Sequence, residues 1–339
     1  MKLLKSFVII SLLTLVVLTG CDPKTPEYKQ RLKMANGTAP ELEFYRYEEV
    51  LFNIDTAHFQ EALLEIQDQY KPFLAGDLSD PMAVRYLKDF ATDPMSIALY
   101  QKVKQAFPDL SRVRDIVEEE YRRFNYYYPE VTLPKKVFTC VSGVDPYTPA
   151  ALFSSEGDLV VSLDWYLDGD EVYDMMGMPQ YRSQRTGLPT LAKDMGTMLC
   201  MNVHREGHRQ GNLLEEMVYA GICAFFVEAM YPSISDEVLL GYTPSQLQWA
   251  EDFEGDLWAD MVGSQCLYSS ELELYRTFLA DGPFTNEYSH EAPARLGEFI
   301  GLHIVRSYME SHPEVNLRQL MEKSDLQEIF QDSKYKPKK

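Results

Sequence analysis

The spacing of apolar residues constrains the fold of this chain more than any other feature, because it changes twice along the sequence. Apolar residues return every three or four positions through residues 45–124 and again through 191–309, which is typical of helices with one buried face. This pattern predicts helices over 110–128, 191–203 and 213–230, and a last long helix that begins at Pro293. Between these stretches, residues 137–141, 150–153 and 159–163 are short runs rich in β-branched and aromatic residues, which favour strands. The sequence therefore predicts an α+β fold, mainly α, with a small central β-sheet.

The N-terminus predicts a segment that is not part of this fold. Lys2 and Lys5 precede an apolar run from Phe7 to Leu18, which is too short to span a bilayer comfortably and matches the apolar region of a secretory signal. The run ends Leu18-Thr19-Gly20-Cys21, which resembles the lipobox of bacterial lipoproteins. That resemblance implies that a diacylglyceryl group is attached to the Cys21 thiol and that the chain is cut just before this residue. Cys21 is thus the predicted lipidation site.

The predicted organisation follows from these two patterns. We expect a lipoprotein signal peptide at residues 1–20, a lipidated tether at 21–40, a single globular domain at 41–333 and a basic tail at 334–339. Within the domain we expect a helical half at 41–128, the small sheet at 137–165 and a second helical half at 190–331. Hydrophobic residues make up 45% of the chain, which is enough for a sizeable core and excludes a disordered protein.

The charge balance limits the partners of the chain. Its 32 basic and 52 acidic residues give a formal net charge of −20, and an acidic surface repels the phosphates of nucleic acid. We therefore expect no nucleic-acid partner. The expected partners are a membrane, through the lipid on Cys21, and proteins of the cell envelope.

Four further cysteines, Cys140, Cys200, Cys223 and Cys266, are widely spaced and lie in apolar surroundings. They form no C-x-x-C pair, so a zinc-ribbon or thioredoxin-like site has no support. We expect buried free thiols, with one disulfide as the alternative.

An ordered set of motifs resembles the gliding-motility lipoprotein GldB family of Bacteroidetes from about residue 40 to the C-terminus. The motifs that carry this resemblance are Tyr126-Tyr127-Tyr128-Pro129-Glu130, Met178-Pro179-Gln180-Tyr181, Gly241-Tyr242-Thr243-Pro244 and Ala292-Pro293-Ala294-Arg295-Leu296-Gly297. The resemblance implies a lipoprotein of the envelope, anchored to the inner or the outer membrane and facing the periplasm or the cell surface, with partners in the envelope or the gliding machinery. It also implies a distant similarity to zinc-dependent proteases, and so a zincin-like helical body.

A zinc site is the first alternative that this similarity raises. Two histidines four apart on a helix can bind one zinc ion, and His204 and His208 have that spacing. Glu215 or Glu216 would be the third ligand. The intervening Glu206 is one place later than in H-E-x-x-H, about 100° further round a helix, and so would point away from the site.

The position of the histidines argues against this zinc site. In the zincin-like plan the ligands belong inside the apolar helix predicted at 191–203, but that helix contains Lys193-Asp194 and no histidine. We therefore expect no cofactor and a non-catalytic interaction or assembly module with a degenerate zincin-like fold. The alternatives are a zinc-dependent peptidase or hydrolase that uses His204 and His208, and a periplasmic module that binds a peptide or a glycan.

Three other polar residues are candidates for a ligand contact or a structural role. Arg295 and Arg306 are eleven residues apart, about three helical turns, and so are expected on one face of the last long helix. A pairing with buried acids such as Glu215 or Glu216 is the expected structural role of these arginines, and binding of a ligand carboxylate is the alternative. Asp164 lies beside the predicted sheet, where either role is open.

Overall fold

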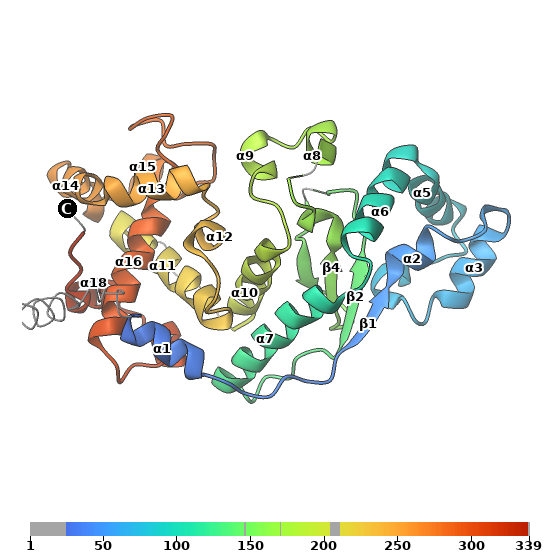
Figure 1. Cartoon of the computed structure of the whole chain (residues 1–339), viewed down its shortest axis with the longest axis horizontal. Coiled ribbons are helices and arrows are strands. Elements are labelled where there is room, and N and C mark those ends of the chain that lie inside the picture. Colours follow the sequence, from blue (N-terminus) through green and yellow to red (C-terminus); the bar gives the residue numbers. More distant parts are fainter. Residues whose placement is uncertain (1–24, 146, 170, 204–210, 338–339) are drawn as a thin grey trace, which may run out of the picture.

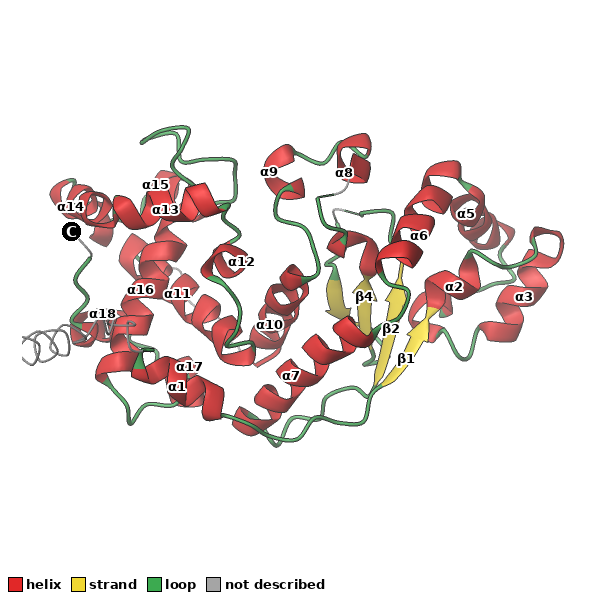
Figure 2. Ribbon diagram, in the orientation of Figure 1, coloured by secondary structure: helices red, strands yellow, loops and turns green. Residues whose placement is uncertain are grey.

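A small sheet lies near the middle of the molecule, with helices on both sides (Figures 1 and 2). The computed structural model describes residues 25–337 apart from 146, 170 and 204–210. In these residues the sheet has four strands in the order β1-β2-β4-β3. The strands are β1 (Glu43–Arg46), β2 (Lys136–Cys140), β3 (Ala151–Phe153) and β4 (Leu159–Ser162). Neighbouring strands among β1, β2 and β4 run parallel, whereas β3 runs antiparallel to β4 and forms one edge.

Strand β1 was not predicted, because the helical pattern appeared to start at residue 45. Its four residues pair with β2 from Glu43↔Lys136 to Arg46↔Thr139, and the helix α2 begins at the next residue, Tyr47. A strand this short has too few residues to show a period of two, so its pairing with β2 decides its conformation. The three other strands confirm the predicted small sheet.

Helices before and between the strands form the first part of the chain. They are α1 (Glu27–Met34), α2 (Tyr47–Leu51), α3 (Phe59–Ile66), α4 (Lys71–Leu74), α5 (Pro81–Thr92), α6 (Pro94–Ala106) and α7 (Ser111–Tyr127). Asp80 and Asp93 cap α5 and α6, since each side chain accepts a hydrogen bond from the first turn of its helix and a proline follows at the first helical position.

In the described residues after the sheet, the regular elements are all helices. They include η3 (Leu163–Tyr166, a 3₁₀ helix), α8 (Glu171–Met175), α9 (Gln180–Ser183), α10 (Pro189–Val203), α11 (Leu213–Met230), α12 (Asp236–Leu240), α13 (Pro244–Asp252), α14 (Glu254–Gly263), α15 (Leu272–Leu279), α16 (Leu296–Ser311), α17 (Leu317–Met321) and α18 (Leu326–Ser333). The α+β, mainly α prediction is therefore confirmed. None of the described helices has the length and apolarity needed to cross a bilayer.

The sheet separates two hydrophobic clusters, because successive strand residues point to opposite faces. On β2, Val137 faces the larger cluster, whereas Phe138 and Cys140 face a smaller one formed with α2–α5. The larger cluster reaches from Tyr28 to Ile329 and joins α7, α10, α11 and α16. Helix α10 therefore lies between the sheet and the C-terminal helices (Figure 1).

The closest helix packing in this larger core is between α11 and α16. A Cβ built on Gly221 would collide with the main chain of Gly301, and one built on Gly301 would collide with the main chain of Met217. Glycine at these positions lets the two backbones touch.

Part of the predicted tether, residues 27–34, is folded onto the body. Residues 27–34 form α1, and Tyr28 and Leu32 are buried in the larger core. Lys29 forms an ion pair of 3.3 Å with the buried Glu228, and Glu310 accepts hydrogen bonds from the main chain at Glu27 and Tyr28. The tether predicted for 21–40 is therefore wrong from residue 27 onward, because the apolar side chains on one face of α1 are buried in the larger core.

The four cysteines of the body are free thiols. Cys140, Cys200 and Cys266 are buried and Cys223 is half-buried, in agreement with the predicted free thiols. Burial raises the pKa of the Cys140 thiol, which keeps it protonated at neutral pH.

Candidate functional site

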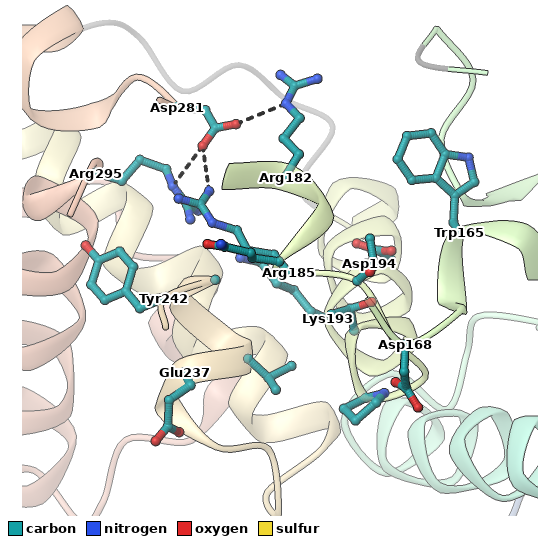
Figure 3. Close-up of a pocket in the computed structure, with 16 residues that line it drawn as sticks. Trp165, Asp168, Arg182, Arg185, Lys193, Asp194, Glu237, Tyr242, Asp281 and Arg295 are labelled. Atoms are coloured by element: carbon teal, nitrogen blue, oxygen red, sulfur yellow. Dashed lines mark hydrogen bonds and ion pairs between the residues drawn. The ribbon is translucent and has the colours of Figure 1, made fainter. Parts of the chain in front are cut away.

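A cleft of about 470 Å³ lies over the N-terminal half of α10. Its walls come from segments far apart in the sequence: η3 and the residues after it, α9, α12, and the two residues Asp281 and Arg295 (Figure 3). Trp165 lines the sheet side of the cleft and Tyr242 lines the opposite side. Because α10 is packed on α7 and α11, its exposed first turns form a fixed floor.

Basic side chains converge in this cleft. Arg185 and Arg295 both approach the carboxylate of Asp281, at 2.9 and 3.7 Å, and Arg295 also pairs with Glu298 at 3.0 Å. Arg182 reaches the second oxygen of Asp281 at 3.6 Å (Figure 3). One aspartate is therefore shared by three guanidinium groups.

Lys193 adds a further positive charge beside these arginines. A Cβ built on Gly241 would lie 2.9 Å from Arg295 Nη2 and 3.5 Å from Lys193 Nζ, so the two cations lie close to one point of the cleft. Gly241 has φ +65° and ends α12, and its missing side chain leaves room for both. Within the described residues, Lys193 Nζ has no hydrogen bond or ion pair. Burial and the nearby Arg295 lower the pKa of Lys193 to about 8.

The same surroundings act on Arg185. Burial and the neighbouring Arg295 lower its pKa, while Asp281 opposes that effect. The cleft also has acids at other positions: Asp168 lies against the backbone of Gly187, and Glu237 lies on α12. The surplus of positive charge is therefore local, at the point where Lys193, Arg185 and Arg295 meet, and this point is suited to an anionic group.

Asp194, the residue after Lys193 on α10, lies on the side of the cleft that faces the sheet, where it contacts Tyr166 of η3. Asp194 accepts a hydrogen bond of 3.0 Å from the Tyr166 hydroxyl, and burial raises its pKa to about 6. Glu120 of α7 is fully buried, and neither of its carboxyl oxygens has a hydrogen-bond partner in the described residues. Burial, reinforced by the charge of Asp194, raises the pKa of Glu120 well above its ordinary value.

A second hollow of about 540 Å³ continues the cleft along α10. Trp165 and Asp194 line both hollows, so the two meet at these residues. The second hollow lies between α10, with Thr197, Met198 and Met201, and residues 148–153, which include strand β3. One end of the combined groove is thus basic, and the other is bounded by an edge strand and methionines.

A comparison with known protein families matches residues 28–337 to the family described as gliding motility protein GldB. The chain belongs to the GldB family. This match covers nearly all of the described structure and confirms the family resemblance found in the sequence. No curated protein and no solved structure matches the chain.

Membership of the GldB family, whose name is that of a lipoprotein, indicates a gliding-motility lipoprotein of the cell envelope. It does not distinguish the inner from the outer membrane. Cys21, the predicted lipidation site, lies outside the described residues, as do His204 and His208. The zincin-like similarity stays a prediction.

The predicted third zinc ligands have other contacts in this GldB-family structure. Glu215 belongs to a capping box at the start of α11: its carboxylate accepts a hydrogen bond from the main-chain N–H of Asn212, and Gln327 also donates to it. Glu216 accepts from the main-chain N–H of Gly211. Within residues 25–203 and 211–337, leaving aside 146 and 170, no group of three or more His, Cys, Asp or Glu side chains is arranged to hold a metal ion.

Arg306 has a structural role, but with other acids than predicted. It pairs with the buried Glu228 at 2.9 Å and with Asp236 through two hydrogen bonds of 2.7 Å. The predicted pairing with a buried acid is therefore present, but the acid is Glu228 and not Glu215 or Glu216, which lie at the other end of α11. Arg306 thus joins α16 to α11 and α12.

Arg295 does not share a helical face with Arg306. It has φ +59° and precedes α16, so its side chain points into the cleft instead. There it donates a hydrogen bond to the carbonyl of Leu240 in addition to its ion pairs. Of the three polar candidates, Arg295 is the one that lines the cleft.

Asp164 braces the loop after β2. Its fully buried carboxylate accepts hydrogen bonds from the main chain of Ser142 and Val144, at 2.9 and 2.7 Å, and from the Ser142 hydroxyl. Burial raises its pKa while these hydrogen bonds oppose that effect. This is a structural role.

The sequence reasoning missed most of the cleft. The sequence pointed to Lys193 and Asp194 only as residues that occupy the place of zinc-binding histidines. It did not predict Arg185 or Asp281 as site residues. These residues come from three separate segments with no regular spacing. A usable signal was the presence of a lysine on an otherwise apolar helix of an acidic protein.

Proposed function

We propose that this GldB-family protein is a membrane-anchored, non-catalytic interaction module of the cell envelope, and that the cleft over α10 binds an anionic group of its partner. The anchor is the lipid predicted on Cys21. The partner belongs to the envelope or the gliding machinery. No cofactor takes part in this binding.

The observation that carries the proposal is the unpaired Lys193 ammonium beside Arg185 and Arg295. Glu298 and Asp194 act on Lys193 only at a distance, and a partly buried cation that forms no ion pair costs free energy. An anion from a partner would remove this cost and would gain charge-assisted hydrogen bonds. The cleft is therefore better suited to holding an acidic group than to leaving the lysine unpaired.

The same charges favour binding over metal-dependent hydrolysis. A Zn²⁺ ion bound over α10 would lie beside Lys193 and the arginines, and like charges at short range in a cleft repel strongly. Asp194, the acid nearest to Lys193 on the helix, is already hydrogen-bonded to Tyr166. The helix floor therefore supports anion binding.

The alternative, a zinc hydrolase using His204 and His208 with Glu215 or Glu216, makes a different prediction. Metal analysis of the purified protein separates the two functions. Stoichiometric zinc that is lost in a His204→Ala variant would overturn the proposal. Absence of stoichiometric zinc, with no change in the variant, supports it.

Photocrosslinking in native envelopes tests the interaction directly. A photoreactive phenylalanine analogue replaces Gln184, which is exposed at the cleft, or Tyr86, which is 75% exposed on α5 and serves as the control. We expect a discrete adduct from position 184 that disappears when Lys193→Met is added, and none from position 86. Adducts that do not depend on Lys193, or no adduct from position 184, would refute the proposal.

A further inference from the structure

The edge strand β3 has main-chain groups that no other strand of the described chain uses. Ser162 N–H donates to the carbonyl of Ala150, and Ser154 N–H donates to the carbonyl of Asp158, both at 2.8 Å. Hydrogen-bonded positions alternate along an antiparallel pair, so Leu152 also faces β4. The N–H and C=O groups of Ala151 and Phe153 therefore point away from β4, at the free edge of the sheet.

This free edge borders the second hollow. Residues 148–153 form one side of the hollow and α10 forms the other. Unpaired edges bind extended peptides by adding a strand, with main-chain hydrogen bonds for affinity and neighbouring pockets for side chains. Met198 and Met201 on α10 provide an adaptable apolar surface opposite the edge.

The pairing of β3 with β4 shows which end of the free edge lies nearer to the basic cleft. The N-terminal end of β3 is paired with Ser162, the end of β4, and η3 with Trp165 follows at once. Trp165 and Asp194 are the residues at which the two hollows meet. The N-terminal end of β3 is therefore the end nearest to Lys193, and a segment antiparallel to β3 would run with its C-terminus toward the cations.

We propose that the groove binds an extended peptide that adds an antiparallel strand to β3 and places its C-terminal carboxylate beside Lys193, Arg185 and Arg295. This inference rests on the proposed function, since it names the class of partner that the cleft binds. A carboxylate supplies the counter-ion that Lys193 lacks, and the chain behind it supplies partners for Ala151 and Phe153. The two features together favour a peptide over a glycan, which has no regular N–H and C=O groups to pair with a strand.

Matched peptides test this inference. The full-length protein, in detergent, is screened against immobilised pentapeptides with free C-termini, and the best binder is compared with its C-terminal amide in solution. We expect the amide to bind at least about tenfold more weakly, because a charge-assisted hydrogen bond is lost. The Lys193→Met variant should bind both forms with similar affinity. Lys104→Met removes an exposed lysine on α6 and should leave the difference unchanged.

Methylation of the peptide backbone tests the added strand. In a strand paired on one side, every second N–H faces β3. A scan with single N-methyl groups should therefore weaken binding about tenfold or more at alternate positions and have little effect at the positions between. A uniform effect, equal binding of acid and amide, or no peptide binder at all would overturn the inference.

A glycan partner gives a separable outcome. An acidic oligosaccharide, oligogalacturonate, is tested in the same assay with wild type and Lys193→Met. Binding that depends on Lys193, without any peptide binder, would overturn the peptide inference and leave the anion-binding function standing. Failure to obtain a Lys193-dependent adduct from position 184 in native envelopes would instead refute the proposed function itself.

Discussion

Replacement of Lys193 by methionine should stabilise the protein at neutral pH. The side chain keeps nearly the same length and methionine forms helices about as well as lysine, but the ammonium is removed. A pKa lowered from 10.5 to about 8 corresponds to about 3 kcal/mol of unfavourable free energy for the charged form in the folded protein. Lys193 is partly exposed, so solvent screening reduces the expected gain to about 1–2 kcal/mol.

The pH dependence of this gain has a defined sign. Below pH 8 the lysine is charged in both the folded and the unfolded chain, so the full cost is present in the wild type. Between pH 8 and 10.5 the folded protein has a neutral Lys193 while the unfolded chain is still protonated, and the cost is progressively relieved. The stability of the wild type should therefore approach that of Lys193→Met as the pH rises through this range.

Thermal unfolding of both proteins at pH 7 and pH 9.5 measures the effect. We expect a melting temperature roughly 2–4 °C higher for Lys193→Met at pH 7, with less than half of this difference remaining at pH 9.5. Lys104→Met, which removes an exposed lysine, should match the wild type at both values. A variant no more stable than the wild type at pH 7 would refute the reasoning, because it would mean that the ammonium is already compensated.

Three further changes test other parts of the structure. Gly301→Ala should destabilise the protein by about 2–3 kcal/mol in urea unfolding, because its Cβ would collide with the α11 backbone. The control Gly263→Ala, with open space around it, should be neutral or stabilising. A neutral Gly301→Ala would contradict the close contact between α11 and α16. Arg306→Met should cost about 3–5 kcal/mol by the same measurement, because it removes the guanidinium that pairs with the buried Glu228; a cost under about 1 kcal/mol would show that the pair is dispensable. Cys21→Ala should abolish labelling by radioactive palmitate and release the protein from membranes, whereas persistent labelling would rule out Cys21 as the lipid site.

Long helices were the most predictable part of this fold. The apolar pattern predicted a helix over 213–230, and α11 spans Leu213–Met230; it also predicted one over 110–128, and α7 spans Ser111–Tyr127. The last long helix was expected to begin at Pro293 but begins at Leu296. The reason is tertiary: the carbonyls of Pro293 and Ala294 accept hydrogen bonds from Thr285 and Tyr242, which holds this segment outside the helix.

The site was less predictable because its charges come from distant segments. Nothing in the spacing of Arg185, Lys193, Asp281 and Arg295 relates them, and only the packing of α9, α10 and α12 brings them together. The start of α1 was mistaken for tether for a similar reason. Its few apolar residues do not form a long periodic pattern, and their burial depends on helices some 200 residues further along the chain.

The fate of a bound peptide tests most directly whether this cleft binds its partner without cleaving it. The purified protein is incubated with a peptide that binds in the C-terminal carboxylate assay, with and without a metal chelator, and the products are analysed by mass spectrometry. We predict that the peptide is recovered intact and that its affinity is the same with the chelator present. Cleavage of the peptide that stops when the chelator is added would contradict a non-catalytic function.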